Sequence, residues 1–193
     1  MSVSAPAPRP AASLADTLAW GHGPRVLEVF LEPTCPFSGR AFGKLDALLA
    51  RAGEDRLTVR IRLQSQPWHL FSPVVCRAVL AAATLPDGRT AARAVLAAVF
   101  AHREQFDHVD HASGPNLDLT LREVIGRIEA LSGLALADAF AAPGLDRDLK
   151  WQARYARQNG IHATPTFMVD GLVAPDIGSG DSVDAWLDKL GLA

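Results

Sequence analysis

The tetrapeptide Cys35-Pro36-Phe37-Ser38 places a thiol and a hydroxyl at the spacing of a redox pair. A Cys-x-x-Cys pair exchanges disulfides because its second thiol attacks the mixed disulfide that the first thiol has formed. The Ser38 hydroxyl can donate a hydrogen bond to a sulfur, but it cannot form a disulfide. The motif therefore predicts a cysteine that attacks a disulfide and needs an outside thiol for its release.

The segments around the motif are expected to place Cys35 at the start of a helix. Residues 26–31 indicate a short buried strand before it. The apolar residues after it have helical spacing, at Phe42, Leu45, Leu48 and Leu49. Unpaired N–H groups and the dipole at a helix start favour an anion by roughly 0.3 to 2 kcal/mol. Since about 1.36 kcal/mol is one pKa unit, the dipole alone would lower the pKa of a thiol from about 8.5 to about 7. We therefore expect much of Cys35 to be thiolate at neutral pH.

The composition indicates one folded domain, or one domain that carries an insertion. The chain has 193 residues, 49% of them hydrophobic, and a formal net charge of -2. This balance gives no electrostatic reason to expect a nucleic acid or an anionic membrane as partner, and no segment has the roughly 18 apolar residues of a membrane span. The N-terminus lacks the pattern of a secretory signal, and Cys35 and Cys76 form no disulfide framework. We expect a cytoplasmic protein.

The patterns along the chain divide it into a tail, a split α/β domain and a helical insertion. The N-terminal segment, rich in Pro and Ala, is expected to be mostly disordered, apart from a short docking that Leu18 and Trp20 allow. The spacing of apolar residues turns helical after Pro67 and stays so for about 90 residues. The predicted segments are 1–24 for the tail, 25–66 and 146–193 for the α/β domain, and 67–145 for the insertion.

Strand patterns appear before and after the helical stretch. Residues 57–63 alternate between apolar and polar types, which is typical of a half-buried strand and completes a β-α-β unit. Asp170-Gly171 lies between two short apolar runs and is the strongest short signal for a two-residue hairpin turn. Residues 183–190 have the spacing of a final amphipathic helix. This order of elements is that of a thioredoxin-type sheet interrupted by helices.

With these motifs in place, the chain resembles the DsbA-like branch of the thioredoxin superfamily. The resemblance rests on the Cys-Pro-x-x motif after a strand and on residues 161–167 (Ile-His-Ala-Thr-Pro-Thr-Phe) before a hairpin, and it extends from about residue 25 to 190. It implies an α/β thioredoxin-like fold with an inserted helical domain. It also implies that Pro165 is cis, lies beside the sulfur of Cys35, and is preceded by a residue, Thr164, that presents its backbone to an extended substrate.

Two positions depart from the pattern of this family. Ser38 stands where the second cysteine is usual, and Val29 stands where a buried carboxylate often assists proton transfer. The nearest acids are Glu28 and Glu32. Both departures concern the step that frees the substrate, so they point to monothiol chemistry or to lost chemistry. The chain also resembles kappa-class glutathione transferases and their isomerase relatives, which share the insertion and use a Ser or a single thiol to activate glutathione.

Other residues have both a functional and an ordinary explanation. Trp68 and His69 lead into the insertion, where they would supply an apolar wall and a proton donor, although a loop histidine is more often solvated. Cys76 lies in an Ala- and Val-rich helix and is predicted to pack in the core; the alternative makes it a resolving thiol for Cys35. A polar loop has ligand types that suit zinc, but without the tight spacing of a metal site, and we predict no metal there. Its residues are His102, Asp107, His108, Asp110 and His111.

The sequence therefore favours a thiol–disulfide oxidoreductase that acts through Cys35, with Ser38 stabilising the thiolate. The residues expected to shape the substrate groove are Pro36, Phe37, Trp68, His69, Thr164 and Pro165. We expect no bound cofactor, glutathione as a candidate co-substrate, and a small thiol or a disulfide-containing peptide or protein as partner. Two alternatives stay open: a glutathione transferase or isomerase of kappa-like type, and a non-enzymatic module that binds peptides.

Overall fold

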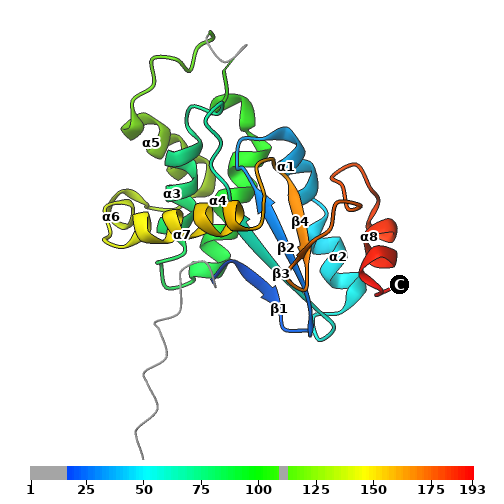
Figure 1. Ribbon diagram of the computed structural model, residues 1–193. Helices are drawn as coiled ribbons and strands as arrows, with labels where there is room; N and C mark the ends of the chain where they lie inside the picture. The colour runs from blue at the N-terminus through cyan, green and yellow to red at the C-terminus, as the bar shows by residue number, and fades with distance from the viewer. Residues whose placement is uncertain (1–16, 109–112) are drawn as a thin grey trace, which may run out of the picture.

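The computed structural model describes residues 17–108 and 113–193, and these form a five-stranded mixed sheet with helices packed around it (Figure 1). The strands are β1 (Ala19–Gly21), β2 (Arg25–Leu31), β3 (Leu57–Leu63), β4 (Thr166–Val169) and β5 (Leu172–Val173). Their order in the sheet is β1-β3-β2-β4-β5. Strands β2 and β3 are parallel and the other neighbours are antiparallel, so the expected β-α-β unit and the C-terminal hairpin share one sheet.

Most of the helical residues lie between β3 and β4. The helices are α1 (Pro36–Phe42), α2 (Leu45–Ala52), α3 (Ser72–Ala82), α4 (Gly88–Ala101), α5 (Leu121–Ser132), α6 (Ala137–Phe140), α7 (Leu145–Gln158) and α8 (Val183–Leu190), with a 3-10 turn, η2 (Arg103–Gln105), after α4. Helices α3 to α6 form a block beside the sheet, whereas α2 and α8 lie together on its other side in the view of Figure 1. Within residues 17–108 and 113–193, none of the helices has the length and apolar character needed to cross a bilayer.

The helix predicted around Phe42 is two helices in the structure. The apolar positions Leu45, Leu48 and Leu49 are buried in α2 as expected, but α1 ends at Phe42. The chain turns at Gly43, whose N–H donates to the carbonyl of Gly39 at 3.0 Å. The motif therefore opens a short separate helix, because the chain must bend before α2 can pack its apolar face against the sheet.

Strand β3 is buried on both faces, so the prediction of a half-buried strand was wrong. Six of its seven residues are buried. The reason can be seen in neighbouring β2, where successive residues face opposite sides of the sheet. Val29 belongs to the large core and Phe30 to a second core that includes Ala156 of α7, so both faces of the sheet are covered. The polar residue Arg62 is buried on the α7 side because it pairs with Glu28, with an Nε–Oε1 distance of 2.6 Å.

The folded domain begins earlier than the sequence indicates. Leu18 is fully buried, and β1 pairs antiparallel with β3, so that Ala19 lies opposite Arg60. The docking that the sequence allowed for Leu18 is confirmed, and it extends the folded unit back to residue 17, whereas residues 1–16 of the expected tail lie outside the described residues. A three-residue strand is too short to show a period, and the burial of Leu18 depends on partners that are distant in sequence.

The predicted C-terminal hairpin and final helix are confirmed. Asp170 and Gly171 both have positive φ, 49° and 86°, as a type I′ turn requires. The Asp170 carboxylate pairs with Arg25 and accepts the N–H of Val26 at 2.8 Å, which fastens the turn to the start of β2. The Ser182 hydroxyl accepts the N–H of Ala185 at 3.1 Å and caps α8.

The variant Leu18→Ala tests whether the N-terminal strand belongs to the folded unit. We expect its free energy of unfolding to fall by about 2 to 5 kcal/mol, because truncation of a fully buried leucine leaves a cavity. Urea unfolding followed by tryptophan fluorescence measures this change. Leu172→Ala is the matched control at an exposed position, with an expected change of less than about 0.5 kcal/mol. Equal stability of the two variants would contradict the docking of residues 17–21.

Candidate active site

Cys35 is the N-cap residue of α1, as the sequence predicts. The strand β2 ends at Leu31, and Pro36 occupies the first turn of the helix, where a missing N–H costs nothing. The residue is extended, with φ -75° and ψ 126°, and it is mostly buried. Only its sulfur end reaches a pocket, so the fold presents one thiol at the C-terminal end of a central strand.

The sulfur of Cys35 meets the segment that precedes β4. The Thr164–Pro165 peptide bond is cis, the conformation that the family resemblance implies. The Cys35 thiol donates a hydrogen bond to the carbonyl oxygen of Thr164, with an Sγ–O distance of 3.6 Å. Two segments 129 residues apart thus form one site.

His69 is the main group that favours the Cys35 thiolate. Burial raises the pKa of the thiol, but a side-chain hydrogen bond with His69 and weaker contributions from Ser38 and the Phe37 backbone outweigh it, so the pKa lies below its ordinary value. The same hydrogen bond is the largest cause that raises the pKa of His69. The sequence assigned this role to the helix start and Ser38. The short α1 contributes through its first N–H groups, but an imidazolium is the stronger partner.

His69 is held at this place by its loop, so the solvated-bystander alternative was wrong. Its side chain is 10% exposed, and its Nε2 lies 3.7 Å from Oε2 of Glu32. The His69 N–H donates to the carbonyl of Gln66 at 3.1 Å, and the Gln66 side-chain amide donates to the carbonyl of His162 at 3.1 Å. The loop after β3 is thereby tied to the cis-proline segment, which fixes the imidazole beside the sulfur.

Glu32 is a candidate functional residue that was not selected from the sequence. Its side chain is fully buried, and Oε2 accepts the N–H and the hydroxyl of Thr34 at 2.8 and 2.9 Å. Burial raises the pKa of this carboxyl, while Ser72, His69 and Thr34 partly oppose the change. Val29, which stands where the family often has a buried carboxylate, lies in the apolar core. The position of Glu32 directly after the strand and three residues before Cys35 is the sequence feature from which its place at the site could have been predicted.

Ser38 lies fully buried beneath Cys35. Its hydroxyl oxygen accepts the N–H of Glu32 at 3.1 Å, so its own proton is directed elsewhere, and the hydroxyl contributes to lowering the pKa of Cys35. The residue therefore has both a structural and an electrostatic role. It connects the first turn of α1 to the end of β2.

A pocket of about 460 Å³ opens at the sulfur. Phe37 and Trp68, 53% and 50% exposed, form an apolar rim, and Thr164 also lines the pocket. The lining residues are Cys35, Pro36, Phe37, Trp68, His69, Arg103, Asp107, His108, Ala163 and Thr164. The predicted groove residues except Pro165 thus line one pocket. The sequence analysis did not predict Arg103 at the site, and it considered Asp107 and His108 only as metal ligands.

The loop with zinc-type residues has a different role in the structure. Among the residues that the structure describes, no group of three or more His, Cys, Asp or Glu side chains is arranged to hold a metal. Asp107 instead pairs with Arg103, while Asp110 and His111 lie outside the described residues. Asp107 also lies 4.0 Å from His69, measured from Oδ1 to Nδ1, so the loop contributes charge to the thiol pocket.

Cys76 packs in the core, as predicted. The residue is fully buried in α3, and burial is the main cause that raises the pKa of its thiol well above the ordinary value. Both cysteines are free. A thiol that is buried and held protonated is a poor nucleophile, so the structure argues against Cys76 as the resolving group for Cys35.

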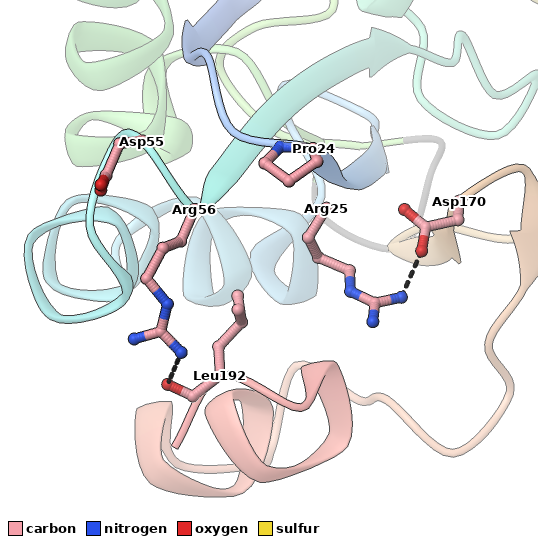
Figure 2. A pocket seen from close by; sticks show the side chains of 6 residues that line it. All are labelled: Pro24, Arg25, Asp55, Arg56, Asp170 and Leu192. Carbon is pink, nitrogen blue, oxygen red and sulfur yellow. Dashed lines mark hydrogen bonds and ion pairs between the residues drawn. The ribbon is translucent and has the colours of Figure 1, made fainter.

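A second pocket, of about 370 Å³, lies where β2 begins (Figure 2). Its charged side chains already serve the fold, because Arg25 pairs with Asp170 and Arg56 donates to the carbonyl of Leu192 at 3.3 Å. Cys35 follows the other end of the same strand. This pocket therefore contributes nothing to the thiol site.

A cysteine at the start of α1, facing a cis-proline before a hairpin, defines a thioredoxin-fold protein, here with helices inserted after β3. The chain matches no protein-family model, and a search of curated proteins found no match. Among solved structures, one described as a candidate protein-disulfide isomerase from Pseudomonas syringae is 62% identical, with a TM-score of 0.90 over 92% of this chain and 99% of that one. The chain belongs to the DsbA-like branch of the thioredoxin superfamily.

More distant structures share the fold. A thioredoxin-like oxidoreductase from Silicibacter pomeroyi is 20% identical, with a TM-score of 0.65 over 91% of this chain and 94% of that one. DsbA2 from Pseudomonas aeruginosa is 18% identical, with a TM-score of 0.61 over 96% of this chain and 97% of that one. The predicted fold class, a thioredoxin-like fold with an inserted helical domain, is confirmed.

The variant His69→Gln tests the source of the low thiol pKa. In the wild type, the rate of Cys35 alkylation by iodoacetamide should rise with a midpoint below the roughly 8.5 of a free thiol. Loss of the imidazolium disfavours the thiolate, so the midpoint should move up by about one pH unit. His22→Gln, at an exposed position, is the matched control and should leave the profile unchanged. An unshifted midpoint in His69→Gln would assign the effect to the helix start instead.

Proposed function

We propose that the protein is a thiol–disulfide oxidoreductase that works through Cys35 alone, by monothiol exchange with disulfide-containing molecules. The observation that carries this proposal is the pocket that Cys35 and His69 share. In it His69 lowers the pKa of the thiol, buried Glu32 lies 3.7 Å from the imidazole, and the Cys35 thiol donates to the Thr164 carbonyl. The names printed for the similar structures, a protein-disulfide isomerase and thioredoxin-like oxidoreductases, support the general class of chemistry.

The first step is attack by the Cys35 thiolate on one sulfur of a disulfide. A bond forms between Cys35 Sγ and that sulfur while the original S–S bond breaks, and its electron pair leaves on the other sulfur. The leaving thiolate takes a proton from the His69 imidazolium, which lies beside Cys35. The products are a mixed disulfide on Cys35, a free thiol and a neutral His69.

The second step is release by an external thiol. This thiol gives its proton to neutral His69 and attacks the substrate sulfur of the mixed disulfide. A new S–S bond forms between these two sulfurs, and Cys35 leaves as a thiolate that is again paired with the imidazolium. Each step breaks one disulfide and forms one, so the cycle needs no further oxidant or reductant.

No group of the described chain is placed to perform the release. The Ser38 hydroxyl cannot form a disulfide, and Cys76 is sealed in α3. Glutathione is the small thiol that we propose as co-substrate. A cytoplasmic location, where such thiols are kept reduced, stays a prediction.

The lowered pKa of Cys35 weighs against a purely non-enzymatic binding module. Such a module needs only the groove at Thr164, and its cysteine would keep an ordinary pKa. Here a buried imidazole and a buried carboxylate are placed next to the sulfur, at a cost in desolvation that binding alone does not require. No observation of similar strength favours glutathione conjugation or isomerisation.

Incubation with oxidised glutathione tests the first step. We expect one glutathione adduct per chain at neutral pH, located on Cys35 by peptide mass spectrometry, because the other thiol is buried. Reduced glutathione should remove it. Cys35→Ser should form no adduct, whereas Cys76→Ala should be modified like the wild type. An unmodified Cys35 at neutral pH would refute the proposal.

The variant Ser38→Cys tests the monothiol character. The introduced thiol would lie beneath the sulfur of Cys35, where the serine hydroxyl now contributes to the low pKa. We therefore expect this variant to release bound glutathione without an added thiol and to end as an internal disulfide, measured by thiol titration and mass spectrometry. Ser132→Cys in α5 is the control, and it should keep the adduct. Spontaneous release from the wild type would show that another group resolves it.

A further inference from the structure

We propose that the ion pair Arg103–Asp107 binds the zwitterionic amino-carboxylate end of a small disulfide, the class that includes cystine and oxidised glutathione. This inference rests on the proposed function, because it assigns a substrate class to the same pocket. It goes further in naming a recognition site within that pocket, whose lining includes Arg103 and Asp107.

The pair supplies both charges that such a ligand needs. Arg103 lies in η2 and pairs with Asp107 four residues later. Both side chains are partly exposed and line the pocket that contains Cys35. A cation and an anion side by side match a ligand ammonium and carboxylate arranged in the opposite order, and the planar guanidinium has further N–H groups for a carboxylate. An apolar peptide would gain no binding free energy from these two charges.

Asp107 lies close enough to the sulfur for a short ligand to reach both. Its Oδ1 is 4.0 Å from Nδ1 of His69, and Asp107, His69 and Cys35 line the same pocket. The carboxylate and the reacting sulfur thus border one space. A ligand whose disulfide contacts Cys35 can therefore place its charged end on the pair without leaving the pocket.

The segment that carries the pair is braced from behind. The Asn116 side-chain amide donates to the carbonyls of Glu104 and Asp107 at 2.9 and 2.7 Å. Arg127 of α5 donates to the Asn116 side-chain oxygen at 2.8 Å and to the carbonyl of Gln105 at 2.7 Å. These bonds fix the backbone on which Arg103 and Asp107 stand, so little ordering is left for the ligand to impose.

His108 provides an independent sign that a polar ligand belongs here. Both of its ring nitrogens are buried and have no partner among the described residues, although a neutral imidazole has one donor and one acceptor to satisfy. Its ring lies against Phe71, with 5.4 Å between the ring centroids. The residue lines the Cys35 pocket, so a ligand carboxylate could accept its N–H.

There is room beside the pair for the rest of the ligand. A second hollow of about 180 Å³ shares Arg103, Asp107 and His108 with the Cys35 pocket and is completed by Glu104, Pro115 and Asn116. The pair therefore faces two adjoining spaces. A tripeptide-sized molecule can span them, whereas an extended polypeptide at Thr164 would leave the smaller one empty.

Competing disulfides of different charge test this inference. We would measure the rate of Cys35 adduct formation with oxidised glutathione, with cystine and with uncharged hydroxyethyl disulfide. The readout is the ratio of each zwitterionic rate to the uncharged rate, so that changes in thiol reactivity cancel. We expect this ratio to fall about tenfold in Arg103→Met and in Asp107→Asn, which corresponds to about 1.4 kcal/mol. Arg103→Lys should retain most of it, and Arg89→Met, outside the pocket, should leave it unchanged.

The outcomes separate this inference from the proposed function. A fall for both zwitterions supports the subsite, and a fall for one alone supports it for that ligand. Ratios that stay constant in Arg103→Met and Asp107→Asn, with normal reaction of hydroxyethyl disulfide, would overturn the subsite and leave monothiol exchange in place. A thiol that reacts with none of the three probes would overturn the proposed function itself. If the natural substrate is a disulfide within a protein chain, we expect the ratios to stay constant in both variants, because such a chain does not need the ion pair.

Discussion

A thiolate in a mostly buried site needs groups that offset the cost of its burial, and the main one here is His69, which lines the same pocket as Cys35 and lowers the pKa of its thiol. The partners come from different parts of the chain, one from the turn after β2 and one from the loop after β3. The parallel pairing of these two strands brings their C-terminal ends to one edge of the sheet. Gln66 then joins the His69 loop to the segment before Pro165. The fold can be understood as the means of keeping one imidazole against one sulfur.

Buried Glu32 extends this arrangement by one charge. The family's usual position for a carboxylate points into the apolar core here, as Val29, and the acid has moved to the residue that follows the strand. From there it faces His69 rather than the core, with an Oε2–Nε2 distance of 3.7 Å. A carboxylate next to the imidazole favours the cationic form, which in turn favours the thiolate. Cys35 and Glu32 thus both raise the pKa of His69.

The features that the sequence predicted correctly are local. Cys35 at a helix start and the turn at Asp170-Gly171 follow from neighbouring residue types, and cis Pro165 follows from the family resemblance. The features it missed depend on tertiary contacts. His69 was expected in the groove as a proton donor, but nothing near it in sequence reveals that it lowers the pKa of Cys35. The position of Arg103 in the pocket could not be predicted either, because only the folded insertion brings this residue near Cys35.

The buried hydroxyl of Ser38 has a consequence for how the site responds to its surroundings. A two-cysteine site closes on itself, and its oxidised fraction depends on disulfide concentration divided by the square of thiol concentration. With one sulfur, a small disulfide and the protein thiol give a mixed disulfide and a small thiol. The ratio of modified to free Cys35 therefore depends on the concentration of small disulfide divided by the concentration of small thiol. Dilution of the whole pool changes the first quantity but not the second. Under the proposed monothiol exchange, a serine at this position would make the degree of modification a gauge of redox balance that is independent of total abundance.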